Sequence, residues 1–208
     1  MLLIVAGLFV RSLARAQHAY LGFDPDHLLN VTLDPKEVGY DEVRTKNFYR
    51  DLEARVCALP GVQTASSAFS VPMGNVSDGS SIYIEGHPLT PGQQPPIVIY
   101  NKVDAPYFDT LRIPLLRGRA FRENDDEKAP LVAIINQEMA HDFWPNEDAI
   151  GKRFSLKSAS GPFVEIVGVT GNGKYVFIGW NKERYFYVPL AQDFNSYRTC
   201  LLYTSRCV

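Results

Sequence analysis

The sequence predicts an α+β fold that is rich in strands, divided into two lobes and preceded by an apolar helix. Short apolar runs with β-branched or alternating residues indicate strands, and only a few segments carry the three- and four-residue spacing of a buried helix face. The 208 residues include 46% hydrophobic and 21% charged residues, which is ordinary for a globular domain. This length is sufficient for one sizeable domain or for two small lobes.

The amino terminus is an uncharged run, MLLIVAGLFV, followed by Arg11 and Arg15. Ten apolar residues are too few to cross a membrane, which takes about 20. Three interpretations are open: a signal peptide cut near Ala14-Arg15-Ala16, a buried helix of a soluble domain, and the exit half of a transmembrane helix. A signal peptide carries its basic residues before the apolar stretch, whereas here they follow it. We favour the third interpretation, which gains support from motifs further along the chain.

Residues 1–19 are therefore assigned to the end of a transmembrane helix and its exit segment. We expect Met1–Arg15 to be a continuous helix that packs poorly against the rest of the protein, because its apolar residues lack a polar face toward water.

Residues 20–103 form the predicted first lobe. Its elements are a strand at His27–Leu33, a helix from the cap Asp41 to about Leu59, and strands at Val62–Val71, Ser81–Glu85 and Ile97–Val103. The predicted buried face of the helix consists of Phe48, Tyr49, Leu52, Val56 and Leu59. Cys57 falls on this apolar side and is interpreted as a buried structural thiol. The first strands and the helix form a strand–helix–strand unit, which needs a partner layer to bury its faces.

Residues 104–190 form the predicted second lobe, which is rich in strands. Its elements are a short helix at Asp104–Leu111, an extended segment at Arg112–Gly118, a helix from the cap Asn136 to Trp144, and strands at Leu131–Ile135, Arg153–Lys157, Phe163–Thr170 and Arg184–Val188. We expect Phe121, Phe143 and Trp144 to be buried anchors of this lobe rather than ligand contacts, because large rings dominate local packing.

Charge and composition exclude several classes of function. The 21 basic and 23 acidic residues are well mixed, and no basic stripe suited to nucleic acid is present. Three cysteines without a repeated spacing predict neither a disulfide framework nor a zinc site, and the four scattered histidines lack the spacing of metal ligands. The acidic run Glu123, Asp125, Asp126 and Glu127 is interpreted as a solvated turn. We therefore predict no catalytic, cofactor-binding or metal-binding residue and no cofactor.

One segment has the spacing of a phosphate-binding loop, GVTGNGK at Gly168–Lys174. In such loops a Ser or Thr hydroxyl follows the lysine and a helix begins there, but this chain has Tyr175 and then an aromatic, β-branched run. We interpret the segment as a glycine-rich turn between strands that does not bind ATP.

A series of motifs along the chain resembles a known family. The motifs are YFDTLRIPLLRGRAF at residues 107–121, VAIIN at 132–136, FWPNEDAIGKR at 143–153, IVGV at 166–169 and YVPL at 187–190. Their order is similar to that of the MacB-like periplasmic core domain of FtsX-type ABC transporter permeases, over about Met1–Leu190. Residues 191–208, with Cys200 and Cys207, depart from this pattern and are interpreted as an atypical tail that is not native.

The resemblance implies an extracytoplasmic domain at the bacterial inner membrane. It implies no catalysis in this chain, and a role in coupling ATPase-driven motion of membrane helices to export or other extracytoplasmic work. The implied partners are a separate ABC ATPase subunit, a second permease in a homodimer or pair, a periplasmic adaptor protein and the membrane. The alternatives are a soluble secreted binding module with a cleaved signal peptide, and an enzyme that uses the glycine loop.

Overall fold

The structure is a computed structural model that describes residues 2–17, 19–74, 76–177 and 183–205. The helices are α1 (Leu2–Gln17), the 3-10 helix η1 (Pro35–Val38), α2 (Glu42–Cys57), α3 (Tyr107–Thr110) and α4 (Gln137–Phe143). The strands are β1 (Leu28–Leu33), β2 (Val62–Ala68), β3 (Asp78–Ser81), β4 (Tyr83–Ile84), β5 (Ile97–Val103), β6 (Leu115–Gly118), β7 (Val132–Asn136), β8 (Arg153–Ser155), β9 (Phe163–Thr170), β10 (Tyr185–Pro189) and β11 (Arg198–Thr204).

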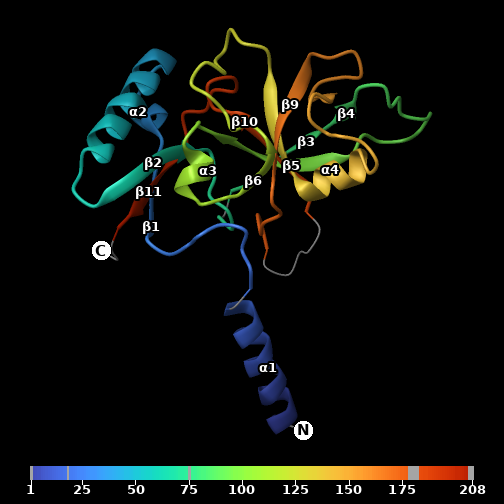
Figure 1. Ribbon diagram of the computed structural model, residues 1–208. Coiled ribbons are helices and arrows are strands. Elements are labelled where there is room, and N and C mark those ends of the chain that lie inside the picture. Colours follow the sequence, from blue (N-terminus) through green and yellow to red (C-terminus); the bar gives the residue numbers. More distant parts are fainter. Residues whose placement is uncertain (1, 18, 75, 178–182, 206–208) are drawn as a thin grey trace.

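The described strands form one open, mixed sheet in the order β1-β11-β2-β5-β10-β7-β9-β8-β4, while β3 pairs with β5 and β6 pairs with β9 (Figure 1). The pairs β5–β10 and β7–β9 are parallel, and the other pairs are antiparallel. The predicted strand-rich α+β class is confirmed.

The sheet carries a hydrophobic core on each face. Along β7, Ile134 belongs to one core and Ile135 to the other, and both side chains are fully buried. Tyr187 and Phe186 alternate in the same way along β10. The first, the α3 core, consists of Ala68, Val103, Tyr107, Phe108, Leu111, Ile113, Phe121, Val132, Ile134, Val167, Tyr175, Tyr185, Tyr187 and Leu201. The second, the α4 core, consists of Ile82, Val98, Tyr100, Ala133, Ile135, Met139, Trp144, Ala149, Phe154, Val164, Ile166, Val169, Phe186 and Val188.

Both cores take residues from both predicted lobes. In the α4 core, Tyr100 of β5 stacks on Phe186 of β10 with 4.9 Å between ring centroids. In the α3 core, Ala68 and Val103 pack together with Tyr107 and Tyr187. The predicted boundary near residue 103 therefore falls inside one sheet.

The caps and the central strands were predictable. The Asp41 carboxylate accepts a hydrogen bond from the Arg44 amide at 2.8 Å, and the Asn136 side chain accepts one from the Met139 amide at 3.0 Å. The predicted strands Ile97–Val103 and Phe163–Thr170 coincide with β5 and β9.

The prediction of one short strand at Ser81–Glu85 is wrong, because the structure has two strands there, β3 and β4. The chain changes partners at Ile82, which is fully buried, so that β3 pairs with β5 whereas β4 pairs with β8. The predicted strand is therefore interrupted at Ile82 and divides into β3 and β4.

A second correction concerns the carboxyl-terminal segment, because Arg184–Val188 is not the last strand. β11 lies between β1 and β2 and pairs with each of them over at least six residues. Leu201, in the middle of β11, is fully buried in the α3 core. Residues 198–204 are therefore part of the sheet, and the residues that follow, 206–208 with Cys207, lie outside the described residues.

The predicted buried face of α2 is only partly correct. Tyr49 is buried, whereas Phe48, Leu52 and Val56 are half-buried and Leu59, beyond the helix, is 53% exposed. Cys57 is exposed, so its interpretation as a buried structural thiol is wrong. The helix covers the sheet with one narrow stripe, and its last turn lies at the edge of the contact.

The three aromatic anchors do not form one cluster. Phe121 is 5% exposed in the α3 core, and Trp144 is 4% exposed in the α4 core, on the other face of the sheet. Phe143 is only half-buried, and Arg184 lies over its ring at 5.4 Å from the centroid. The prediction is confirmed for Phe121 and Trp144 and is wrong for Phe143.

Helix α1 stands away from the sheet and is joined to it by a linker (Figure 1). Its apolar side chains are 52–72% exposed and comprise Ile4, Val5, Leu8, Phe9, Val10 and Leu13. Over residues 4–14, whose side chains are described, this arrangement confirms the predicted helix that packs poorly against the rest, whereas Met1 lies outside the described residues. Among the described residues, no helix combines the length and the apolar character needed to cross a membrane.

Candidate functional site

The glycine-rich segment at residues 168–174 does not have the geometry of a phosphate-binding loop. Gly168 and Thr170 belong to β9, which corrects the prediction of a turn over the whole segment, and no helix begins at Lys174. A Cβ at Gly168 would lie 2.5 Å from the Arg119 carbonyl oxygen, so this glycine permits close strand packing. Tyr175, at the position of the hydroxyl residue, is buried and stacks on Tyr185 at 3.8 Å between ring centroids.

The acidic run at residues 123–127 is not a uniformly solvated turn. Asp125 is 6% exposed and accepts two hydrogen bonds from the Arg119 guanidinium, at 2.7 and 2.9 Å, and a third from the Arg122 amide. Burial acts to raise the pKa of Asp125, but the hydrogen bonds and charge of Arg119 outweigh it and lower that pKa. Asp125 therefore closes its loop structurally. Within the described ranges, no cluster of three or more His, Cys, Asp or Glu side chains could hold a metal ion.

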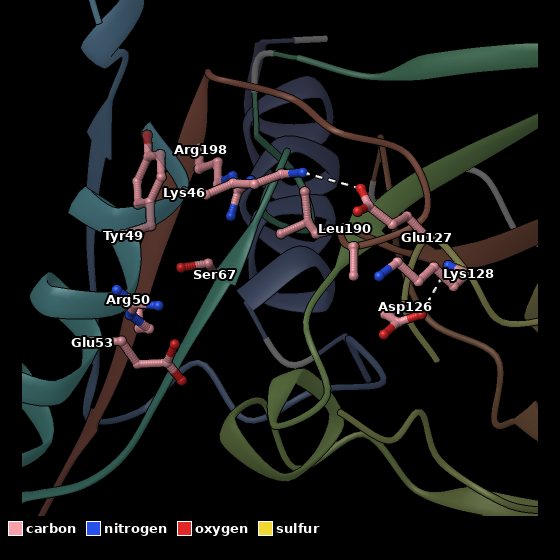
Figure 2. Close-up of a pocket in the computed structure, with 11 residues that line it drawn as sticks. Lys46, Tyr49, Arg50, Glu53, Ser67, Asp126, Glu127, Lys128, Leu190 and Arg198 are labelled. Carbon is pink, nitrogen blue, oxygen red and sulfur yellow. Dashed lines mark hydrogen bonds and ion pairs between the residues drawn. The ribbon is translucent and has the colours of Figure 1, made fainter. Parts of the chain in front are cut away.

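A charged cavity of about 360 Å³ lies between α2 and the turn at residues 126–128. We call it the α2 cavity, and it is lined by Lys46, Tyr49, Arg50, Glu53, Ser67, Asp126, Glu127, Lys128, Leu190, Ala191 and Arg198. Figure 2 shows the α2 residues and the nearby Ser67 on one side, and Asp126, Glu127 and Lys128 on the other side. Lys46 bridges the two sides, with its Nζ 2.7 Å from Glu42 and 3.3 Å from Glu127.

Arg198, at the start of β11, presents a largely desolvated guanidinium to this cavity. Its Nε donates to the Asn195 carbonyl oxygen at 2.8 Å, and the guanidinium carbon lies 4.6 Å from the Tyr49 ring centroid and 5.6 Å from that of Phe194. Burial lowers the pKa of Arg198 from its usual value. Within the described part of the chain, the guanidinium has no carboxylate within ion-pair distance.

Glu53 lies on the same wall and is half-buried. Burial raises its pKa, the charge of Glu123 acts in the same direction, and the charge of Arg198 acts in the opposite direction. A carboxylate and a guanidinium therefore face one cavity without forming an ion pair.

The floor of the cavity is tied to a buried carboxylate. Asp104 follows β5 directly and accepts hydrogen bonds from the Ser66 hydroxyl, at 2.7 Å, and from the Ser67 amide. Burial raises the pKa of Asp104 to about 7, although these two hydrogen bonds act in the opposite direction. The contact joins β2 to the end of β5.

Sequence reasoning missed the α2 cavity because its charged residues are far apart in the chain. The only local signal was the stripe Lys46, Arg50 and Glu53, which recurs at helical spacing on α2. Arg198 lies in the segment that was predicted to be an atypical tail. The contact between Ser67 and Asp104 depends on strand pairing that no local pattern specifies.

The linker after α1 is the other site with a specific geometry. The Leu21 carbonyl oxygen accepts a hydrogen bond from the Lys174 amide at 2.8 Å, and the Asp24 amide donates to the Leu111 carbonyl oxygen at 2.9 Å. Gly22 has a φ of +84°, and a Cβ there would lie 2.4 Å from the Gly173 Cα. The linker is therefore held against the loop after β9 and against the end of α3.

Comparison with known proteins assigns this fold to a family. Residues 1–204 match the family of MacB-like periplasmic core domains. This match continues past Leu190, where the sequence analysis expected it to end, and includes all of β11. None of the curated proteins compared with the chain matches it.

Two solved structures have similar folds. The periplasmic region of MacB from Actinobacillus actinomycetemcomitans aligns with a TM-score of 0.57 and 13% identity, over 90% of this chain and 78% of that one. The extracellular domain of the noncanonic ABC-type transporter YknZ from Gram-positive bacteria aligns with a TM-score of 0.52 and 15% identity, over 86% and 83% of the two chains. At such identities the likeness concerns the fold.

Proposed function

Because the chain belongs to the family of MacB-like periplasmic core domains, we propose that it couples ATPase-driven movement of membrane helices to export or other work outside the cytoplasm. The coarse function follows from the family, since the chain is the periplasmic domain of an ABC transporter permease. In this proposal the partners are a separate ATPase subunit, a second permease and a periplasmic adaptor. No catalytic step is assigned to the chain.

The docked linker is the observation that carries the proposal. α1 has exposed apolar side chains, and the segment that leaves it is hydrogen-bonded to the loop after β9 and to the end of α3. The Tyr203 hydroxyl of β11 also donates to the Asp24 carboxylate at 3.1 Å. A displacement of α1 would thus reach the loop after β9, the end of α3 and β11 through short, direct contacts.

The test is hydrogen exchange in the complete permease assembled with its ATPase in proteoliposomes. We expect ATP to change amide exchange in residues 19–27 and 171–174. Gly22→Ala should reduce this change while ATP hydrolysis continues, because its Cβ cannot fit against Gly173. Gly39→Ala is the matched control, since Gly39 has a similar φ of +81° but has nothing within 4 Å of the added Cβ.

Two results would contradict the proposal. If ATP does not change amide hydrogen exchange in residues 19–27 and 171–174 of the unmutated protein, mechanical coupling through the linker is excluded. Recovery of the mature protein from the soluble periplasmic fraction, without residues 1–16, would favour a secreted binding module.

A further inference from the structure

The α2 cavity contains two cationic side chains that have no anionic partner within the described residues. The first is Arg198, whose Nε is occupied by the Asn195 carbonyl oxygen while its two terminal nitrogens remain available. The second is Lys128, an exposed residue whose backbone amide donates to Asp126 but whose ammonium has no ion pair among the described residues. Figure 2 shows the Lys128 ammonium pointing into the cavity from the side opposite α2.

Other groups complete a polar lining. The Ser67 amide donates to Asp104, but the Ser67 hydroxyl has no hydrogen-bond partner among the described residues, and the side chain lines the cavity on the side of α2 and Arg198 (Figure 2). Leu190 and Ala191 add an apolar wall. A concave site with a few convergent polar groups and an apolar wall is the usual form of a small-ligand site, and about 360 Å³ is within the usual range of size.

We propose that the α2 cavity binds a ligand through one free carboxylate, which contacts the Arg198 guanidinium and the Ser67 hydroxyl, while the Lys128 ammonium faces the ligand from the opposite side of the cavity. The two terminal nitrogens of Arg198 form a planar pair of donors that matches the two oxygens of a carboxylate. The Tyr49 ring, 4.6 Å from the guanidinium carbon, and the hydrogen bond of Nε to Asn195 restrict the movement of this group.

The acidic residues of the cavity select for low ligand charge. Glu53, Asp126 and Glu127 line the same space, so a doubly charged phosphate would meet three carboxylates. Lys46 is already paired with Glu42 and Glu127 and adds little attraction. A singly charged carboxylate is therefore favoured, from a small molecule or from the end of a polypeptide.

The experiment is calorimetric titration of the full chain in detergent at constant ionic strength. The probes are N-acetyl-leucine, its uncharged amide, inorganic phosphate, and an acetylated pentapeptide with a carboxyl-terminal leucine. We expect N-acetyl-leucine to bind with a Kd on the order of 0.1–1 mM and the amide and phosphate to bind more weakly. If the pentapeptide binds more tightly than N-acetyl-leucine, the carboxylate comes from the end of a polypeptide. If the two bind equally, it comes from a small molecule.

Two variants inside the α2 cavity and one control outside it test whether binding occurs there. Ser67→Ala should weaken N-acetyl-leucine binding about tenfold, because it removes a hydrogen bond to a charged group. Lys128→Ala should weaken it about two- to fivefold, and it cannot disturb the core because the residue is exposed. Lys157→Ala, at an exposed lysine outside the α2 cavity, should leave binding unchanged.

The proposal is overturned if no carboxylate binds saturably, if the amide binds as tightly as the acid, or if phosphate binds more tightly than either. It is also overturned if Ser67→Ala and Lys128→Ala both bind like the parent protein. None of these results bears on the linker, so they leave the coupling proposal standing.

Discussion

The outer end of the sheet, formed by β1, β11, β2 and α2, and its inner strands, β5, β10, β7 and β9, are stabilised in different ways. All residues of β7 and β10 are buried, between the two cores. In contrast, four of the six residues of β1 are exposed, and α2 buries only Thr45 and Tyr49. The inner strands are buried mostly by apolar residues on both faces, whereas the outer end contributes few residues, such as Ala68 and Leu201, to the α3 core and adds polar contacts at a few positions.

The junction between the two regions is narrow. β2 pairs with β5 at one position, Ala68 opposite Val103. The Phe69 amide donates to the Lys102 carbonyl oxygen at 2.8 Å, and the Asp104 amide donates to that of Ser67 at 3.0 Å. Loss of the Asp104 contacts would therefore weaken the attachment of the outer end, which Ala68 and Leu201 would still hold to the α3 core.

The largest effect is expected in the α4 core. Trp144→Ala should lower the free energy of unfolding by about 3–5 kcal/mol, because the ring is 4% exposed. Phe143→Ala should lower the free energy of unfolding by about half as much, because the ring of Phe143 is only half-buried. Denaturant midpoints of the two variants measure the difference, and equal shifts would mean that burial at this turn does not determine stability.

The next effect is the dependence of stability on pH, which arises from Asp104 at the junction between β2 and β5. Folding raises the pKa of Asp104 to about 7, so the folded protein binds a proton that the unfolded chain releases near its ordinary pKa of 3.8. Stability from this group is therefore present at low pH and is lost as the pH rises toward 7, by on the order of 2–3 kcal/mol between pH 5 and pH 8. Asp104→Asn should remove that part of the pH dependence in chemical denaturation. An unchanged slope would mean that Asp104 stays ionised in the folded protein.

A smaller effect is expected at α2. The Tyr49 hydroxyl lies 2.7 Å from the carbonyl oxygen of Leu33 and 2.8 Å from that of Ser196, and so connects the helix to β1 and to the segment before β11. Tyr49→Phe should cost about 1–2 kcal/mol, because it removes the one hydroxyl proton that two partly buried carbonyl oxygens share. Tyr40→Phe should be nearly neutral, since its ring contacts Phe48 and its hydroxyl has no hydrogen bond among the described residues. Equal losses of stability in Tyr49→Phe and Tyr40→Phe would mean that the ring contacts, and not the Tyr49 hydroxyl, hold α2 in place.

The smallest effect is expected on β1. Val31 is 45% exposed, so Val31→Ala should change stability by less than about 0.5 kcal/mol. The same substitution at Val98 of β5, which is 1% exposed, should cost about 1–3 kcal/mol. Thermal unfolding of the Val31→Ala and Val98→Ala variants compares the same substitution in the two regions. Similar losses of stability would contradict the contrast between the outer end and the inner strands.

The same contrast explains what the sequence could predict. β7 is buried along its whole length, and β5 and β9 are buried over most of theirs, so all three carry strong apolar signals and their positions were recognised closely. Asp41 and Asn136 were recognised as caps because their residue types suit a local role. For the inner strands and the helix starts, local pattern and final structure agree.

The outer end and the α2 cavity were less predictable. β11 reads RTCLLYT after a polar segment and is specified by its pairing with β1 and β2, which begin far earlier in the chain. Cys57 and Leu59 fit an apolar helix face that the narrow contact of α2 does not extend to cover. The cavity joins residues of α2, β2, β11 and the turn at 126–128, and only the folded sheet brings them together.

The position of β11 between β1 and β2 has a consequence for the order of folding. Thr32 of β1 and Thr199 of β11 share a hydrogen bond although they are 167 residues apart. During synthesis, β1 and β2 leave the ribosome long before the strand that separates them, and pairings of such separation form slowly. Their facing edges stay unpaired during that interval, and unpaired edges favour incorrect association. A nascent chain is therefore most vulnerable to misassembly at this end of the sheet, which closes only when residues 198–204 become available.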